Sequence, residues 1–244
     1  MIPRIIHYCW FGGNTLPKSA KKYIESWKKY YPDFEIKEWN ESNFDVNSIP
    51  YTKEAFAAKK YAFVSDYARF WILYHYGGVY FDTDVEAVAP LNDILEKGSF
   101  MAWETPSGNN EFKIAPGLAL AASPKEKLYE EILEGFEKLS FYKKDGSWND
   151  YTMIPMVTDI LTNLGLKADG RLQTVAGTTI YPNDYFCPMN ALTGVITKTK
   201  NTRTIHHYSM SWMNTKQQRK LKITRLIRRY FGMEFLNKIK SFIR

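Results

Sequence analysis

Two aspartates, Asp82 and Asp84, stand one residue apart in the segment GGVYFDTDVEAV, directly after an apolar run typical of a buried strand. In open α/β sheets the ligand crevice lies beyond the carboxyl ends of the strands, and alternate residues of an extended chain point to the same side. Two neighbouring carboxylates repel each other there, and a hard divalent cation completed by a diphosphate removes that repulsion. The spacing therefore indicates a Mn²⁺ or Mg²⁺ site, with a pair of solvated loop acids as the alternative.

A second charged pair, Asp66 and Arg69, lies in the most strongly helical stretch of the chain, among Phe63, Val64 and Phe70. Residues three apart share a helix face, so the two could form a simple surface ion pair. Their apolar neighbours instead predict a mostly buried pair. Buried charges are costly unless they are partnered, and they often mark functional sites. We therefore expect Asp66 and Arg69 to belong to the site.

Trp10 ends the first apolar run, RIIHYCW, and is followed closely by Gly12 and Gly13. A tryptophan at the carboxyl end of a strand can stack on a flat base, and glycines let the backbone approach a ligand closely. This position predicts a base-binding role for Trp10. A core tryptophan beside an ordinary turn is the alternative.

Adjacent histidines, His206 and His207, lie in the extended segment TRTIHHYSMSW near the end of the chain. Neighbouring residues of an extended chain face opposite ways, so at most one imidazole can reach the crevice. A neutral imidazole suits Mn²⁺ as a third protein ligand beside two carboxylates. We expect His207 to be that ligand, with His206 as the alternative.

Strand-like and helix-like segments alternate along the first part of the chain, which is typical of an α/β fold with a mostly parallel central sheet. Further strands, an amphipathic helix and a second helix are expected before residue 170, and short strands after it. The first five segments are predicted as a strand at 4–10, a helix at 16–33, a strand at 34–40, a helix at 52–78 and a strand at 79–88.

The charge of +7 is concentrated in the last thirty residues, which predicts two parts, a domain at 1–214 and a basic helical tail at 215–244. Ten of the 33 basic residues but only one of the 26 acidic residues follow position 215, so the preceding part holds 23 bases and 25 acids. A near-neutral domain does not favour a nucleic-acid partner. Apolar residues recur at helical spacing among the basic ones, a pattern typical of helices that lie on anionic membranes.

Two other roles for this apolar stripe are possible, packing on the domain or pairing with another subunit.

The chain has only two cysteines, Cys9 and Cys187, and no CxxC pair. This composition favours a reducing compartment. We therefore expect a cytoplasmic protein that associates peripherally with the inner face of the cell membrane.

Three motifs in this order, IIHYCWFGG, FVSDYARFWILYHYGGVYFDTDVEAVAPL and TIHHYSMSW, resemble glycosyltransferase family 32 over roughly residues 1–213. That family includes bacterial capsular and surface-polysaccharide enzymes and yeast mannosyltransferases, and it is related to the glucosylating clostridial toxins. The resemblance implies a GT-A fold, a nucleotide-sugar donor and a divalent metal, usually Mn²⁺. The chain departs from the pattern at Pro116-Gly117, where related sequences often read Asn-Gly, and this puts a sugar-facing amide from that loop in doubt.

The resemblance also implies a role for each candidate residue. Trp10 would stack on the nucleotide's base, and the two aspartates of the DXD motif would hold the metal. Asp66 and Arg69 would grip hydroxyls of the donor sugar. A closing element, formed by Ser211 and Trp212, would cap the diphosphate and the sugar.

The expected function is metal-dependent transfer of a hexose from a nucleotide sugar to a glycan or lipid-linked glycan in bacterial capsule or surface-polysaccharide synthesis. UDP-sugar is the expected donor, GDP-mannose is the alternative, and the family resemblance implies retention of anomeric configuration. A phosphatase of the haloacid dehalogenase type also places DxD after a strand, but its later Gly-Asp motif has no counterpart, because the chain contains no Gly-Asp dipeptide. A non-catalytic membrane-surface module would leave the acids and histidines without a role.

Overall fold

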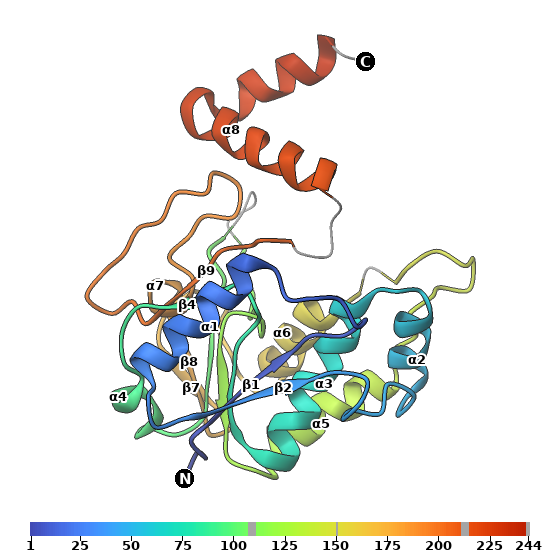
Figure 1. Ribbon diagram of the computed structural model, residues 1–244, viewed down its shortest axis with the longest axis vertical. Helices are drawn as coiled ribbons and strands as arrows, with labels where there is room; N and C mark the ends of the chain where they lie inside the picture. The colour runs from blue at the N-terminus through green and yellow to red at the C-terminus, as the bar shows by residue number, and fades with distance from the viewer. Residues whose placement is uncertain (107–110, 150, 211–214, 243–244) are drawn as a thin grey trace.

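A seven-stranded sheet forms the centre of the computed structural model, which describes residues 1–106, 111–149, 151–210 and 215–242 (Figure 1). Strands β2, β1 and β3 pair in parallel, as do β5 and β8, whereas β6 and β7 run antiparallel to their neighbours. Five of the seven strands thus point the same way, which confirms the predicted α/β fold with a mostly parallel sheet. In spatial order the strands are β2 Glu35–Trp39, β1 Ile5–Cys9, β3 Gly78–Tyr80, β6 Leu120–Ala122, β5 Phe100–Ala102, β8 Thr178–Tyr181 and β7 Gln173–Val175.

Helices cover both faces of this sheet, and a second sheet of two strands, β4 Val85–Ala87 and β9 Thr204–His206, lies beside it (Figure 1). The helices are α1 Lys18–Tyr30, α2 Pro50–Ala57, α3 Tyr61–Tyr76, α4 Asn92–Leu95, α5 Lys127–Glu137, α6 Met153–Asn163, α7 Asn183–Phe186 and α8 Thr215–Phe242.

The alternation of side chains along β3 divides the interior into two cores. Tyr80 packs in the core that contains buried residues of α3, α5 and α6. Val79 and the following Phe81 pack in the opposite core, which contains buried residues of α1 and β4. Successive side chains of a strand point to opposite faces, so a strand covered by helices on both sides is apolar throughout. This burial fixes the end of β3, where the candidate acids begin.

The long helix predicted at 52–78 is wrong, because the structure contains two helices, α2 and α3, with a break at residues 58–60. Lys59 adopts a left-handed conformation with φ of 57°. Its N–H donates to the carbonyl of Phe56 at 2.9 Å, and the N–H of Lys60 donates to that of Ala55 at 2.8 Å. These two bonds form a Schellman motif, which ends α2 without the usual glycine.

The single strand predicted at 79–88 is also wrong, since it consists of β3 and β4 in two different sheets. Asp82, Thr83 and Asp84 lie between them in a turn, which the N–H of Val85 closes by donating to the carbonyl of Asp82 at 3.0 Å. The indole N–H of Trp27 on α1 donates to the carbonyl of Val85 at 2.8 Å. Helix α1 therefore fixes the start of β4 and with it the far end of the turn.

The last helix, α8, lies at one end of the molecule, beyond the layers of the main fold (Figure 1). It changes direction at Gly232, whose φ is 77°. Within the described ranges, no helix combines the length and the apolar composition that crossing a bilayer requires. The boundary between a domain at 1–214 and a tail at 215–244 stays a prediction.

Candidate functional site

The turn between β3 and β4 brings three potential metal ligands together. One carboxylate oxygen from each of Asp82 and Asp84 and one imidazole nitrogen of His206 lie within 4.8 Å of one another. The turn follows the carboxyl end of β3, which is anchored to β1 by the bond from the N–H of Phe81 to the carbonyl of His7 at 3.1 Å. Both aspartates thus stand at the edge of the sheet where α/β proteins bind their ligands.

Asp84 has two strong partners, one from the last residue of β9 and one from the segment that follows β9. His206 Nε2 lies 3.1 Å from one of its oxygens, and the backbone N–H of Ser209 donates to the other at 2.7 Å. Tyr208 and Met210 on either side of Ser209 both have φ of 48°. Non-glycine residues rarely adopt this conformation, which costs roughly 1–3 kcal/mol each and often accompanies functional sites. Here the two strained residues flank the amide that is aimed at Asp84.

The pKa of Asp84 reflects these contacts. Burial alone would raise it, but the charge and hydrogen bond of His206 and the amide of Ser209 outweigh burial and lower the pKa to about 2. Hydrogen bonds and a positive charge favour the ionised carboxyl in this way. Asp84 is therefore a carboxylate at all physiological pH values, as a metal ligand must be.

The structure corrects the choice between the two histidines, since His206 and not His207 faces the aspartates. His207 Nε2 lies 2.8 Å from a carboxylate oxygen of Glu86, and its ring stacks on Tyr23 at 4.7 Å. The physical reason is the start of β4 at Val85. In a continuous strand Asp84 and Glu86 would point to the same side, toward His207. Asp84 instead lies in the turn before β4, so its side chain points away from Glu86 and contacts His206.

Asp82 belongs to a partly buried charge network that joins the two predicted charged pairs, Asp82–Asp84 and Asp66–Arg69. Arg69 Nη2 lies 3.0 Å from Asp66 and 3.2 Å from Asp82, and the hydroxyl of Tyr80 donates to Asp82 at 3.0 Å. Arg69 is only 3% exposed, and its Nε–H donates to the carbonyl of Ser65 at 3.0 Å. The predicted burial of the Asp66–Arg69 pair is thus confirmed, and the pair is connected to the DXD turn.

Burial dominates the titration of both acids in this network. It raises the pKa of Asp66 to about 6, although the neighbouring charge of Arg69 opposes the rise. Burial also raises the pKa of Asp82, again against Arg69, and the charge of Asp84 adds to the rise. Desolvation and a like charge both disfavour the ionised carboxyl. A cation beside Asp82 would relieve both effects.

Gly117 also contributes to the site, and the sequence gives little sign of it. A Cβ atom at this position would collide with the carboxylate of Asp82 and would lie 3.1 Å from Arg69 Nη1. The glycine stands in the turn before β6, within the loop where the chain departs from its relatives at Pro116. The loop thus provides space for the Asp82 carboxylate. In the sequence, the only feature that could indicate this role is a glycine in a turn between apolar segments.

Trp10 lies directly after β1, at the same edge of the sheet as the DXD turn. Its backbone N–H donates to the carbonyl of Trp39 at 2.8 Å, and its half-buried indole donates to the carbonyl of Asn14 at 2.6 Å. Gly12, two residues later, lets the loop pack closely on Tyr61, because a Cβ at this position would collide with the tyrosine ring. Stacking of Trp10 on a base stays a prediction.

Two further predicted residues, Ser211 and Trp212, lie outside the described residues. Their capping role also stays a prediction.

The donor set fits a divalent metal such as Mn²⁺. Two carboxylates and an imidazole are oxygen and nitrogen ligands of the kind that Mn²⁺ accepts. Asp66 and Asp82 contact the guanidinium of Arg69 and Asp84 contacts His206, so three carboxyl groups are gathered around one permanent cation. Within the part of the chain that is described, Nδ1 of His206 is buried without a hydrogen-bond partner. An imidazole not fixed by its second nitrogen can rotate to present either nitrogen to an ion.

Comparison with known proteins identifies the region that carries Asp66, Arg69, Asp82 and Asp84. Residues 17–101 match the family described as the glycosyltransferase sugar-binding region containing a DXD motif. The chain is 28% identical over 157 residues to inositol phosphoceramide mannosyltransferase 1 of Schizosaccharomyces pombe, covering 57% of this chain and 44% of that protein. It is 36% identical over 106 residues to an uncharacterized glycosyltransferase of Acanthamoeba polyphaga mimivirus, covering 41% and 42%.

A solved structure extends the similarity over most of the chain. It is a glycosyltransferase involved in the glycosylation of the major capsid of PBCV-1, with a TM-score of 0.50 at 12% identity, covering 90% of this chain and all of that one. At this identity the likeness concerns the fold, and the expected GT-A type fold is confirmed. The chain spans less than half the length of the curated relatives that it matches.

Proposed function

We propose that this chain is a glycosyltransferase that transfers a hexose from a nucleotide sugar in a metal-dependent reaction, because its residues 17–101 match the glycosyltransferase sugar-binding region containing a DXD motif. The observation that supports this most is the convergence of Asp82, Asp84 and His206 at the carboxyl edge of the sheet. The three side chains come from two segments about 120 residues apart in the sequence. Their convergence is hard to explain by local chain geometry alone.

We propose that Asp82, Asp84 and His206 hold Mn²⁺ or Mg²⁺. Such an ion supplies positive charge that stabilises the departing nucleoside diphosphate. Both carboxylates are held in place without the ion. Ser209 and His206 keep Asp84 ionised, and Arg69 and Tyr80 fix the direction of Asp82. Ligands held by surrounding groups in this way bind with less loss of conformational freedom.

Asp66 is the member of the buried pair that we assign to the donor sugar. Its side chain is 17% exposed, so a carboxylate oxygen can accept a hydrogen bond from a sugar hydroxyl, whereas the side chain of Arg69 is 4% exposed. Arg69 instead holds Asp66 and Asp82 in fixed positions, which refines the role expected for it. We assign the base to Trp10 and the closing of the site to Ser211 and Trp212. No nucleophile is assigned.

Two donors remain candidates. UDP-sugar is the donor expected from the resemblance, but several curated relatives are named mannosyltransferases, which favours GDP-mannose as the second candidate. We propose a glycan or lipid-linked glycan as the acceptor. Retention of anomeric configuration and a role in capsule or surface-polysaccharide synthesis are parts of the same proposal.

A thermal-shift screen of UDP, GDP, CDP and their sugars, each with and without Mn²⁺, tests the function. A ligand that binds only the native state at 100 times its dissociation constant stabilises it by about 2.7 kcal/mol. We expect one nucleotide series to raise the melting temperature, and to do so only when Mn²⁺ or Mg²⁺ is present. If no nucleotide raises it under either condition, the proposed function is wrong.

A further inference from the structure

An apolar stripe on α8 faces solvent. The side chains of Ile223, Leu226 and Tyr230 are 57%, 53% and 69% exposed, and their spacing of three and four residues places them on one face of the helix. Phe231 is 62% exposed and stacks on Phe235 at 4.9 Å, so the apolar surface continues past Tyr230. Exposed apolar surface that is contiguous in this way marks an interaction site more often than scattered single residues do.

Another face of the same helix, about 80–100° around the axis from Leu226, is attached to the body of the protein. Arg225 donates from Nε to the carbonyl of Ala191 at 2.9 Å and from Nη2 to the carbonyl of Tyr208 at 3.2 Å. Gln218, two turns earlier, donates to the carbonyl of Met210 at 3.4 Å. The helix therefore has an inner face that it uses within this chain and an outer face that it does not. Packing of the described stripe against the domain is excluded by this arrangement.

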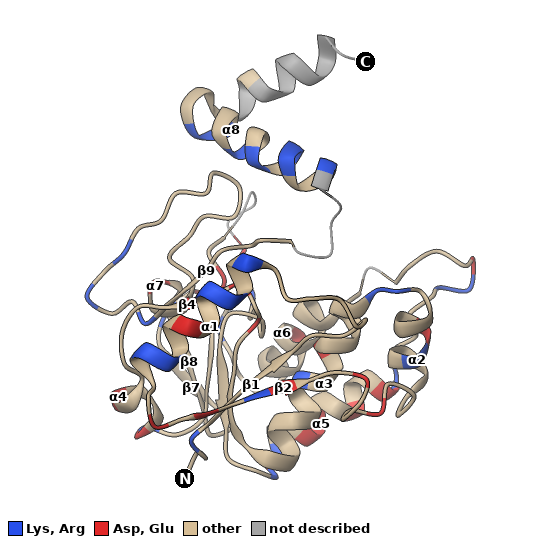
Figure 2. Ribbon diagram, viewed as in Figure 1, with Lys and Arg blue, Asp and Glu red and all other residues tan. Residues whose placement is uncertain are grey.

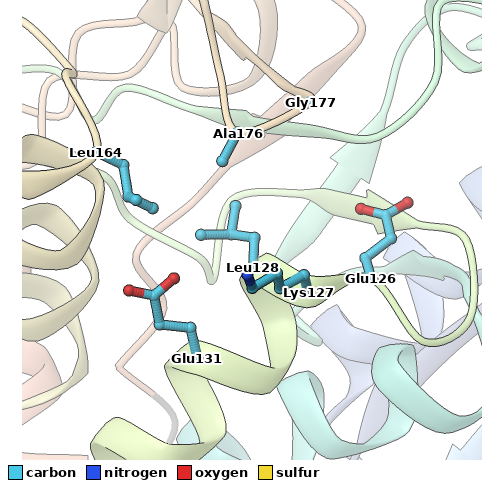
Figure 3. Close-up of a pocket in the computed structure, with 7 residues that line it drawn as sticks. All are labelled: Glu126, Lys127, Leu128, Glu131, Leu164, Ala176 and Gly177. Atoms are coloured by element: carbon cyan, nitrogen blue, oxygen red, sulfur yellow. The ribbon is translucent and has the colours of Figure 1, made fainter.

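Cations lie on the outer face with the apolar stripe. Arg219, Lys220, Lys222 and Arg229 are all exposed, and the only acidic residue after position 215 is Glu234. Figure 2 shows Lys and Arg along the described part of α8 with no Asp or Glu among them, whereas both charges occur on the rest of the fold. At 100° per residue, Arg219, Lys222 and Arg229 fall within about 60° of Leu226 on the helix surface. The outer face is therefore both apolar and strongly positive.

We propose that this outer face of α8 docks on the surface of an anionic lipid bilayer. An apolar stripe with cations beside it matches the boundary between acyl chains and negatively charged headgroups. Pairing with the same face of a second copy would instead bring the cations of two helices together, and like charges at short distance repel. Nucleic acid would satisfy the cations but would leave Ile223, Leu226 and Tyr230 in water.

Docking of this face would also orient the candidate site. The carbonyls that Arg225 and Gln218 bind belong to Tyr208 and Met210, which flank the amide that contacts Asp84. The helix that meets the membrane is thus attached to the segment that completes the DXD site. A lipid-linked acceptor in that membrane would lie on the same side of the molecule. The two cysteines are free and buried, which suits the reducing, cytoplasmic side of such a membrane.

Co-sedimentation of the full chain with phosphatidylcholine vesicles, prepared with and without phosphatidylserine, tests this proposal. We expect binding only to the anionic vesicles, and loss of binding between 0.1 M and 1 M salt, where the Debye length falls from about 10 Å to about 3 Å. Each Lys or Arg near an anionic surface raises the partition coefficient roughly fivefold. The double variant Lys222→Glu/Arg229→Glu is therefore expected to bind at least about tenfold more weakly.

A matched control is the double variant Lys53→Glu/Lys138→Glu, which changes the net charge equally on exposed positions of α2 and the end of α5. It should bind vesicles almost as well as the wild type. A second test variant, Leu226→Ser/Tyr230→Ser, keeps every cation and should still lose most of the binding, because the apolar stripe is removed.

Three results would overturn the proposal. The first is equal binding by the wild type and the Lys222→Glu/Arg229→Glu variant, and the second is equal loss in the control variant. The third combines two observations. The wild type does not bind vesicles, and the Leu226→Ser/Tyr230→Ser variant differs from it in oligomeric state, measured by light scattering. That last result would assign the stripe to a second copy of the chain. None of these measurements depends on transferase activity.

Discussion

At the scale of single residues, the direction of Asp82 depends on three neighbours from different parts of the chain. Tyr80 and Arg69 bind the same carboxylate oxygen, and Gly117 leaves room for the carboxylate because it has no Cβ. A carboxylate that is fixed before the ligand arrives keeps its metal-binding geometry without further ordering. The site thus depends on a residue that carries no functional group.

Replacement of Gly117 by alanine should therefore impair metal-dependent nucleotide binding. The added Cβ would push the Asp82 carboxylate away from Arg69 and Tyr80. Hydrogen bonds to a charged group contribute about 1.5–3 kcal/mol each, so we expect the affinity for nucleotide with Mn²⁺ to fall roughly 10- to 100-fold. Titration calorimetry with UDP and GDP measures the change.

Gly135→Ala is the control for this substitution. Gly135 lies in α5, and neither it nor Gly117 has a left-handed φ. A Cβ at Gly135 would meet the flexible side chain of Met156 at 3.1 Å. This variant should bind nucleotide like the wild type. Unchanged affinity in Gly117→Ala, with a normal melting temperature, would show that Asp82 does not need this space.

Local spacing and composition are enough to select some residues of the site but not others. Asp82, Asp84, Asp66 and Arg69 could be chosen from the sequence because paired acids after a strand, or charges within an apolar helix, are local signals. Ser209 contributes only its backbone amide, and Gly117 only an absence of atoms, so neither gives such a signal. The choice between the two histidines depends on the position at which β4 begins, and the alternation of polar and apolar residues does not reveal that position.

At the scale of secondary-structure elements, His7 joins β1 to two neighbouring segments. Its Nε2 lies 3.0 Å from the carbonyl of Gly77 at the end of α3, and its Nδ1 accepts a hydrogen bond from the indole of Trp39 on β2 at 3.0 Å. The neutral tautomer with a proton on Nε2 satisfies both contacts. A second proton on Nδ1 would face the indole N–H. His7 therefore holds this edge of the sheet together only while it is neutral.

The contribution of His7 to the stability of the fold should consequently decrease as the pH falls, whereas the raised pKa values of Asp66 and Asp82 act in the opposite direction. Burial lowers the pKa of His7 from 6.5 to about 4. Between these values the unfolded chain binds the proton at this histidine more readily, so the contribution of His7 is complete above pH 6.5 and is lost progressively down to pH 4. The full shift corresponds to about 3 kcal/mol. Urea unfolding at pH 7, 6, 5 and 4.5 measures the loss.

His7→Gln provides the comparison, because glutamine does not titrate and its amide can both donate and accept. The variant starts from a lower stability at pH 7, and we expect acidification from pH 6.5 to 4.5 to lower its free energy of unfolding by less than that of the wild type. Equal slopes in the two proteins would assign the acid sensitivity to other groups.

The elements themselves could be predicted in type more readily than in extent. Apolar periodicity indicates helix over residues 52–78 but contains no sign that Lys59 adopts a left-handed conformation and ends α2. Apolar runs likewise indicate extended chain over 79–88 but not the change of sheet at the DXD turn. Both breaks depend on tertiary contacts, such as the bond from Trp27 to Val85, that a single segment cannot reveal.

At the scale of the whole molecule, a near-neutral stretch of the chain is followed by one strongly basic helix, α8. The α/β class follows from the alternation of strands and helices, but the reversed directions of β6 and β7 depend on pairings between segments far apart in the chain. The same is true of the site, because residues 82–84 and 206–209 meet only in the folded protein. The segment from His206 to Met210 connects this site to α8 and hence to the proposed membrane surface.

The central claim is that Asp82, Asp84 and His206 hold the divalent metal, and titration of Mn²⁺ followed by electron paramagnetic resonance tests it most directly. Protein binding removes the signal of free Mn²⁺, so affinities can be measured with and without UDP or GDP. For Asp84→Asn and His206→Gln we expect Mn²⁺ to bind at least about tenfold more weakly. Mutation of a group that only hydrogen-bonds to a metal ligand already lowers metal affinity by about tenfold or more, and loss of a ligand should lower it at least as much. The neighbouring variants Glu86→Gln and His207→Gln should bind like the wild type. Undiminished Mn²⁺ affinity in Asp84→Asn, or a loss confined to His207→Gln, would contradict the account.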